Sequence, residues 1–178
     1  AKLTPTFSLG CKRILLSNDY YPALTRPNVH LETAAITRVG PRGITTAAGV
    51  EHEVDTIILA TGFNAAHHPI GRVIHGVDGR SLAEAEPGGM RAYLGITAPG
   101  FPNLFTLMGP NTGLGHSSIV YMLESQVNYL VDAVRQMDER DLAAVDVKPD
   151  ALAAFDEEMQ ERLARSVWNS GGCSSWYL

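Results

Sequence analysis

The stretch Asp55-Thr-Ile-Ile-Leu-Ala-Thr-Gly-Phe63 decides how the rest of the chain is interpreted. Its apolar and partly β-branched residues, with Val54 before them, predict a strand covered on both faces, as in a parallel sheet. An Ala-Thr-Gly turn follows, and Thr61 and Gly62 are candidates for ligand binding because a glycine lets the backbone approach a flat molecule. The stretch therefore predicts an α/β fold with a binding site at the end of a buried strand.

Short strands separated by turns are predicted on the N-terminal side of this stretch. A short irregular or helical piece is expected around Tyr20, and turns are expected at Gly40-Pro-Arg-Gly43 and at Ala48-Gly49. The predicted strands cover residues 14–16, 29–31, 35–39, 43–46 and 53–60. This region is therefore expected to form a small β-meander that leads into the buried strand.

Two helices are predicted in the C-terminal half. The first begins at about Ser117, with Ser117 or Ser118 as N-cap, and the second begins at Pro149, since proline is favoured at the first helical position. Apolar residues recur at helical spacing in the first helix, at Ile119, Leu123, Val127, Leu130, Val134 and Met137. An apolar strand is predicted at 104–108, and the glycine-rich residues 71–89 are expected to form loop and short strand.

The junction of this strand, a glycine-rich loop and the first helix is the best ligand site on physical grounds. A helix N-terminus presents unpaired N–H groups and about half a positive charge, which suits an anion. The candidate loop residues are Gly109, Pro110, Asn111 and Thr112. Gly113-Leu-Gly115 lacks the third glycine of a dinucleotide fingerprint, so a tight connection that merely needs flexible glycines is the alternative.

Two adjacent cations, Lys12 and Arg13, precede an apolar run. A lysine suits a phosphate because it is a compact point charge, and an arginine suits a delocalised anion because of its fork of donors. A solvated basic pair at the end of a strand is the alternative.

Composition narrows the classes of function. Lys and Arg total 14 and Asp and Glu total 19, so the formal charge of −5 gives no electrostatic case for nucleic acid. No apolar segment approaches the roughly 20 residues of a membrane span. The six histidines have no metal-ligand spacing, and no hydrolase nucleophile elbow occurs.

The two cysteines, Cys11 and Cys173, lie at opposite ends and form neither a Cys-x-x-Cys pair nor a zinc pattern. A soluble chain in the reducing cytoplasm is therefore expected. The opening Ala-Lys-Leu-Thr-Pro is typical of the middle of a longer protein, so a fragment is expected, with removal of an initiator Met as the alternative.

Seven motifs occur in order along nearly the whole chain: Gly-Cys-Lys-Arg (10–13), Asp-Tyr-Tyr (19–21), Arg-Pro-Asn-Val (26–29), Asp-x-x-x-x-Ala-Thr-Gly-Phe (55–63), Gly-Phe-Pro-Asn-Leu-Phe (100–105), Gly-Pro-Asn-Thr-Gly-Leu-Gly-His (109–116) and Ser-Trp-Tyr (175–177). Together they resemble the C-terminal part of the class B flavoprotein monooxygenases, most closely the Baeyer–Villiger monooxygenases. The resemblance implies a partial two-dinucleotide-binding-domain (FAD/NADP) fold without its N-terminal FAD-binding half. Residues 1–62 would end the NADP-binding domain, and residues 63–178 would be the C-terminal part of the FAD-binding domain.

The resemblance also implies roles for single residues. Lys12 resembles a lysine that recognises the 2′-phosphate of NADPH, and Arg13 resembles an active-site arginine that stabilises an anionic flavin peroxide. Ser118 and Ile119 resemble the helix start whose backbone N–H groups meet the pyrimidine edge of FAD. Trp176 resembles a tryptophan that contacts NADP, although without the resemblance it would be a packing residue.

The implied reaction begins with reduction of FAD by NADPH and capture of O2 as a C4a-peroxyflavin. Attack on a ketone carbonyl then gives an ester or lactone. Oxygenation of nitrogen or sulfur in a heteroatom substrate is the alternative. Arg13 favours the ketone, because a peroxy anion must stay deprotonated to attack a carbonyl.

The chain departs from the family pattern in one respect. The glycine fingerprints for FAD and NADP and a His-containing Baeyer–Villiger signature are absent from this sequence. The isolated chain is therefore expected to be inactive without the N-terminal half of the same protein. A disulfide-type flavin reductase, which shares the Ala-Thr-Gly turn, lacks support because no paired-cysteine motif occurs. A folded module without catalysis is the remaining alternative.

Overall fold

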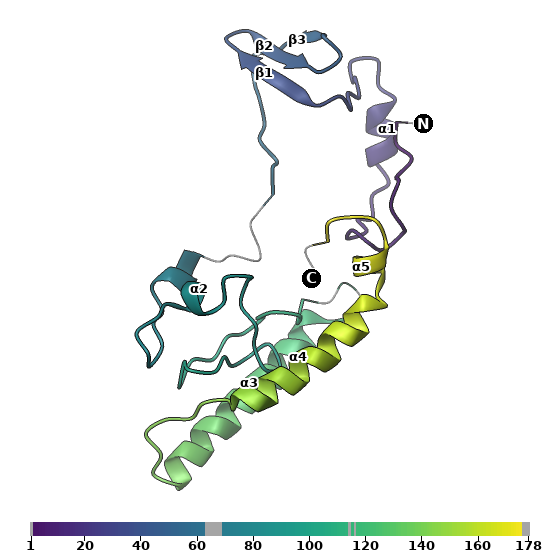
Figure 1. The fold of residues 1–178 in the computed structure, drawn as a ribbon. Helices are drawn as coiled ribbons and strands as arrows, with labels where there is room; N and C mark the ends of the chain where they lie inside the picture. The colour runs from purple at the N-terminus through teal and green to yellow at the C-terminus, as the bar shows by residue number, and fades with distance from the viewer. Residues whose placement is uncertain (1, 63–68, 114, 116, 176–178) are drawn as a thin grey trace. The chain divides into compact units, whose positions relative to one another are not determined.

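The computed structural model describes residues 2–62, 69–113, 115 and 117–175 of the chain. The chain divides into two compact units (Figure 1). The first comprises residues 1–5 and 14–63, and the second comprises residues 6–13 and 64–178.

The first unit contains one short helix and a three-stranded antiparallel sheet. These elements are α1 (Tyr20–Leu24), β1 (Ile36–Gly40), β2 (Gly43–Thr46) and β3 (Glu51–Glu53), and the strand order is β1-β2-β3. Ile44 of β2 pairs with Val39 on one side and with His52 on the other. A Cβ on Gly43 would collide with the carbonyl oxygen of His52, so only glycine fits there. The predicted meander is confirmed over residues 35–46.

The predicted buried strand after the meander is wrong for this chain. Residues 54–62 form no strand, and the side chains of Ile58 and Leu59 are 87% and 80% exposed. The runs at 14–16 and 29–31 form no strands either. An apolar run becomes a strand only where neighbouring strands complete its hydrogen bonds, and no neighbour is present among the described residues.

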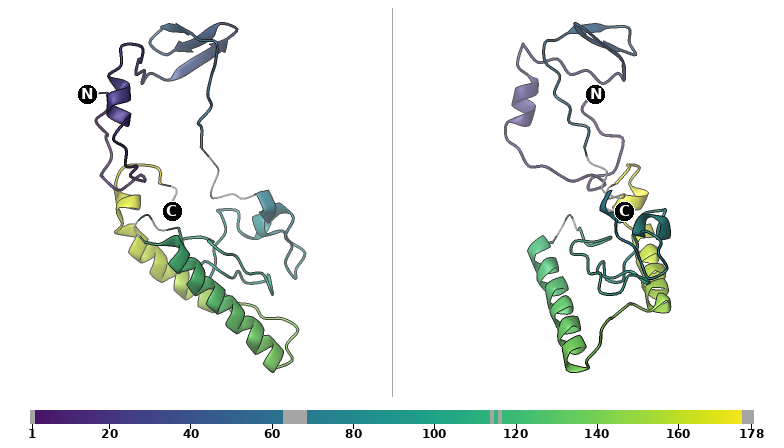
Figure 2. Two further views of the ribbon diagram at one scale, coloured as in Figure 1. Left: turned by 180° about the vertical axis from the view of Figure 1, so that it is seen from behind. Right: turned by 90° about the vertical axis from the view of Figure 1, so that its left-hand side faces the viewer.

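The second unit is built from helices and loops. Its elements are η1 (Pro69–Arg72), α2 (Leu82–Ala85), α3 (Ile119–Glu139), α4 (Pro149–Ala164) and α5 (Val167–Ser170). Figures 1 and 2 show α3 and α4 running in opposite directions, with α5 at the end where α4 finishes. The loops of residues 90–113 contact both long helices, because Tyr93 meets Phe155 of α4 and Met108 meets Gln126 of α3.

The two long helices begin where the sequence predicts. Ser118 is the N-cap of α3, and Pro149 is the first residue of α4. Leu152 and Leu163 of α4 are buried.

Helix α2 lies in the region predicted to be loop and short strand. Its N-cap Ser81 accepts a hydrogen bond from the Glu84 N–H, and the Glu84 carboxylate accepts from the Ser81 N–H at 2.8 Å. This reciprocal capping box stabilises a four-residue helix that has no room for a clear apolar period. Leu82 of α2 packs with Phe101 in the core of this unit.

The segment 104–108 does not form the predicted strand. The Thr106 N–H donates to the Ile96 carbonyl at 2.8 Å, and the Met108 N–H donates to the side chain of Gln126 at 2.9 Å. Met108 also has a φ of 56°, which ends any extended run. The apolar residues here are positioned by turns and side-chain bonds instead of a sheet ladder.

Candidate functional site

The basic pair Lys12 and Arg13 ends the N-terminal segment of the second unit. Both side chains are exposed, and the Lys12 ammonium lies 4.9 Å from the ring centroid of Phe7. The ion pairs within the described part of the chain include neither side chain. Both charges are therefore available to an anion.

The residues before this pair are attached to the C-terminal part of the chain. A disulfide joins Cys11 to Cys173, whose Cα atoms lie 6.1 Å apart, and the Ser8 N–H donates to the Gly171 carbonyl at 2.8 Å. The sequence carries no sign of this pairing, because 162 residues separate the two cysteines. The spacing of the cysteines therefore no longer supports the expected location in a reducing cytoplasm.

The glycine-rich loop is shaped by close backbone contacts. A Cβ on Gly109 would collide with the carbonyl oxygen of Gly95 and lie 2.7 Å from the Thr106 hydroxyl oxygen. Thr112 is buried, and its hydroxyl donates to the Gly109 carbonyl at 2.7 Å. Asn111 adopts a φ of 60°. The tight connection considered from the sequence therefore accounts for Gly109 without a ligand.

The start of α3 lies just beyond this loop. Its N-cap Ser118 makes no side-chain hydrogen bond, and its first turn, which begins at Ile119, carries no acidic residue. The first N–H groups of a helix lack intrahelical partners and concentrate positive charge. The helix start is therefore chemically suited to an anionic or electron-rich group.

Gln126 is a functional candidate that the sequence analysis missed. It is 2% exposed, and its side-chain oxygen accepts from the Met108 N–H, which fixes the loop onto α3. Its Nε2 has no hydrogen-bond partner among the described residues. The sequence does contain a signal for this residue. Gln126 lies seven residues after Ile119 and three after Leu123, so it is a polar residue on the apolar stripe of the helix.

The remaining predicted residues belong to the other unit or lie outside the described residues. Thr61 and Gly62 belong to the first unit, where both are exposed. Gly62 has a φ of 85°, and a Cβ there would have no atom within 4 Å. Trp176 lies outside the described residues.

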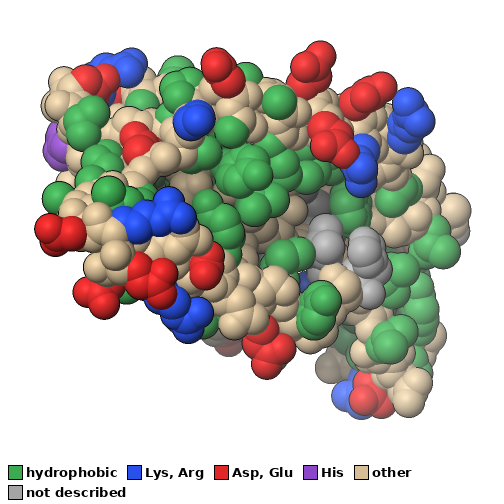
Figure 3. All heavy atoms as spheres, turned by 90° about the horizontal axis from the view of Figure 1, so that it is seen from below, with side chains coloured by type: hydrophobic (Ala, Val, Ile, Leu, Met, Phe, Trp, Pro, Cys, Tyr) green, Lys and Arg blue, Asp and Glu red, His purple; other side chains and the backbone are tan. Residues whose placement is uncertain are grey.

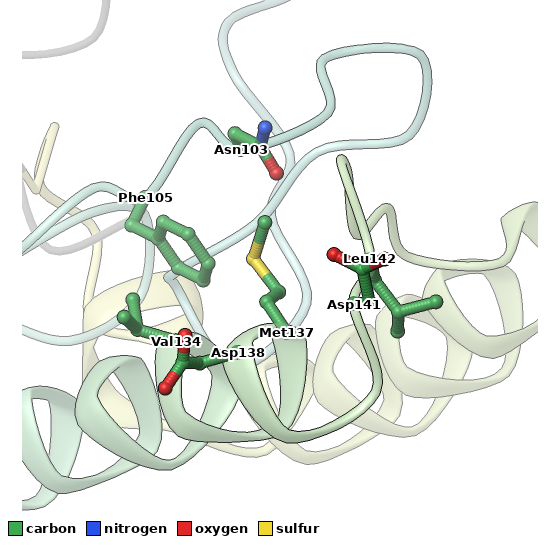
Figure 4. Close-up of a pocket in the computed structure, with 7 residues that line it drawn as sticks. All are labelled: Asn103, Phe105, Val134, Met137, Asp138, Asp141 and Leu142. Atoms are coloured by element: carbon green, nitrogen blue, oxygen red, sulfur yellow. The ribbon is translucent and has the colours of Figure 1, made fainter.

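A surface hollow of about 540 Å³ lies beside the C-terminal half of α3 (Figure 4). Its lining residues are Asn103, Phe105, Val134, Met137, Asp138, Asp141 and Leu142. It contains none of the predicted site residues and lies far along α3 from Ser118. This hollow therefore does not mark the predicted site.

The resolved pKa shifts also lie outside the predicted site. Hydrogen bonds from the Ser81 backbone and hydroxyl lower the pKa of Glu84. The side-chain hydrogen bond to Glu86 raises the pKa of Arg91. Within the part of the chain described here, no three His, Cys, Asp or Glu side chains gather as a metal site would require, and no helix has the length and apolar character to cross a membrane.

Comparison with curated proteins gives strong sequence matches. A Baeyer–Villiger monooxygenase of Streptomyces coelicolor is 50% identical over 179 residues, which cover all of this chain and 34% of that protein. A Baeyer–Villiger monooxygenase of Pseudomonas aeruginosa is 51% identical over 178 residues, which cover 99% of this chain and 34% of that protein. The chain thus spans about a third of the length of these relatives. No protein-family model matches it.

Solved structures agree with these matches. An oxidised steroid monooxygenase bound to NADP has a TM-score of 0.80 at 36% identity, over 95% of this chain and 32% of that one. A structure described as OTEMO in complex with FAD and NADP has a TM-score of 0.81 at 31% identity, over 91% of this chain and 31% of that one. A cyclohexanone-bound cyclohexanone monooxygenase has a TM-score of 0.73 at 30% identity, over 82% of this chain and 29% of that one. The chain is therefore related, over a third of their length, to the flavin-dependent monooxygenases of the Baeyer–Villiger type, and its fold is a part of theirs.

Proposed function

We propose that this chain is the C-terminal part of an FAD- and NADPH-dependent monooxygenase that inserts one oxygen atom from O2 into a ketone. The observation that carries this proposal is the presence, in one unit, of Arg13, which has no ion-pair partner among the described residues, and of the start of the 21-residue helix α3, whose N-cap side chain makes no capping hydrogen bond. Residues 1–62 would then end the NADP-binding domain, and residues 63–178 would belong to the FAD-binding domain.

The residues around the start of α3 fit a flavin. The backbone N–H groups of Ser118 and Ile119 would donate to the electron-rich edge of the ring, where the helix end favours negative charge. Gly109, Pro110, Asn111 and Thr112 would hold this helix start in place through their tight turn. Bound FAD supplies the redox chemistry and the reaction with O2, and the protein supplies position and charge.

Arg13 would stabilise negative charge that develops beside the ring. A guanidinium keeps its proton at any physiological pH, so it remains cationic while neighbouring groups change charge. Lys12 would bind the 2′-phosphate of NADPH as a point charge, and Trp176 would contact the same cofactor.

The Thr61–Gly62 turn would let the backbone approach a flat ring. The open space around Gly62 and its positive φ support this role.

The N-terminal half of the same protein is the proposed partner of this chain. Apolar side chains reach the surface across the face shown in Figure 3. Ile58 and Leu59 are exposed in the first unit, and Val120, Tyr121 and Val131 are exposed along α3. Exposed apolar side chains along one helix, as on α3, are typical of a face that another part of a protein covers. We place the whole protein in the cytoplasm, where NADPH is available.

The full-length protein tests this proposal directly. Purified with FAD, it should oxidise NADPH faster when a cyclic ketone is added, and isotopically labelled O2 should place one labelled atom in the ester product. In a parallel assay with a sulfide or an amine, oxygenation of that substrate while the ketone is left unchanged would replace the ketone reaction with the alternative. The 178-residue chain alone should be colourless, whereas a yellow preparation with bound FAD would contradict the requirement for the missing half.

A further inference from the structure

The disulfide between Cys11 and Cys173 lies at the base of the basic pair. Cys11 is fully buried and Cys173 is half-buried. Lys12 follows Cys11 directly, so any movement of Cys11 moves the two cations.

The surroundings of the disulfide are closely packed. A Cβ on Gly171 would lie 2.9 Å from both the Cβ and the Sγ of Cys11, so glycine is required where the two segments meet. The Ser8 N–H donates to the Gly171 carbonyl, and the Cys11 N–H donates to the Ser8 carbonyl at 3.1 Å. Gly10, with a φ of 88°, lies against Val167 of α5. The segment 8–11 is thus attached by one covalent bond and a small number of weak contacts.

We propose that Cys11 and Cys173 are positioning residues, whose disulfide holds the Lys12–Arg13 segment against α5 and whose reduction releases it. The pair would act as a reversible thiol–disulfide couple, which is the usual behaviour of a disulfide in a cytoplasmic protein. The effect on cofactor binding rests on the roles proposed above for Lys12 and Arg13. The redox couple itself does not depend on those roles.

The chemistry of the couple balances with simple reagents. Reduction by a dithiol starts with attack of its thiolate on one sulfur, and the other cysteine leaves as a thiolate. The second thiol of the reagent then closes its own disulfide, and both cysteines end as thiols. In the reverse direction, hydrogen peroxide accepts two electrons and two protons from the thiols and yields two waters.

The position of the cations depends on this bond because little else holds them. The hydrogen bonds and ion pairs known among the described residues give Arg13 no side-chain partner, and Lys12 has only its contact with Phe7. After reduction, the attachments that the described residues show include the Ser8–Gly171 hydrogen bond and the contact of Gly10 with Val167, and no covalent bond. Greater mobility at Arg13 would weaken its alignment with a bound cofactor.

The first experiment is independent of the proposed function. The full 178-residue chain and the full-length protein are alkylated with and without prior reduction, and their peptides are mapped by mass. Without reductant, the peptides that contain Cys11 and Cys173 should be cross-linked and unalkylated. After reduction, amide exchange at Ser8 and Cys11 should be faster by about tenfold. Free thiols after treatment with hydrogen peroxide, or equal exchange in the two states, would overturn the proposal.

The second experiment separates positioning from stability in the full-length protein. Reduction of the wild type should raise the KM for NADPH by about tenfold, with a smaller effect on kcat. Cys173→Ser should behave like the reduced wild type and should not respond to oxidant, and Ser174→Ala is the matched control. A KM that is equal in the oxidised and reduced states would refute the positioning role. If the protein oxidises no NADPH in either state, the proposed function fails, and amide exchange still decides the redox couple.

Discussion

Replacement of Asn103 should destabilise the second unit more than its surface position suggests. The Asn103 side-chain oxygen accepts from the Val145 N–H at 3.0 Å, and its Nδ2 donates to the Ala143 carbonyl at 3.1 Å. Asn103 also has a φ of 60°, which asparagine tolerates better than alanine. These bonds attach the connection between α3 and α4 to the loop that precedes α3.

The size of the effect follows from these contacts. Each exposed hydrogen bond contributes about 0.5–1 kcal/mol, and alanine in the left-handed region costs about 1 kcal/mol more. Asn103→Ala should therefore lower the free energy of unfolding by about 2–3 kcal/mol, which for a chain of this size lowers Tm by roughly 4–12 °C.

Matched variants separate the two contributions, with thermal unfolding by calorimetry as the assay. Asn103→Gly accommodates the positive φ and loses both hydrogen bonds, so it should unfold between wild type and Asn103→Ala. Asn103→Asp keeps the acceptor for Val145 and loses the donor to Ala143. An unchanged Tm for Asn103→Ala would refute the claim that these hydrogen bonds stabilise the attachment of the α3–α4 connection to the loop before α3.

Three further outcomes follow from the structure. Ser81→Ala should remove the capping box of α2 and cost about 1 kcal/mol of unfolding free energy, measured by urea denaturation. The pKa of Glu84 is lowered in the folded chain, so ionised Glu84 stabilises the fold above its ordinary pKa of 4.5, and this stabilisation is lost as pH falls through the folded pKa. Glu84→Gln should therefore reduce the loss of stability in acid. An unaltered dependence of stability on pH would contradict this role of Glu84. Gln126→Leu should leave the Met108 N–H without its acceptor and cost about 1–3 kcal/mol in the same denaturation assay, and an unaltered free energy of unfolding would contradict this role.

The long helices could be predicted because their signals are local. Helix α3 repeats its apolar residues over 21 positions, and α4 begins with Pro149. The hairpin between β1 and β2 follows from Gly40-Pro-Arg-Gly43, where Gly43 has no room for a side chain. Each of these elements is determined by residues within its own segment.

The features that could not be predicted depend on partners far along the chain. The run at 57–59 has the composition of a buried strand, but a strand also needs neighbours, and composition does not say whether they are present. Residues 104–108 form no strand, and the Met108 N–H donates instead to the side chain of Gln126, 18 residues further along the chain. The Cys11–Cys173 disulfide could not be predicted for the same reason, because no local sequence pattern links residues 162 positions apart.

Around the candidate site, the structure bears out only the local elements. Ser118 is the N-cap of α3, as expected, and Lys12 and Arg13 are exposed. Their roles toward a cofactor stay predictions. Gln126 was missed because only the apolar residues of this helix were considered, although a polar residue on such a stripe signals a buried hydrogen bond.

The rate of ester formation by the full-length protein with Arg13→Ala tests most directly whether this arginine serves the flavin site. We expect kcat to fall by about 100-fold with bound FAD retained, as for the loss of one group that stabilises a developing anion. Arg165→Ala is the matched control, because that side chain is 82% exposed and its ion-pair partner among the described residues is Glu161, four positions earlier. Ketone oxygenation by Arg13→Ala at the rate of the control would contradict the account.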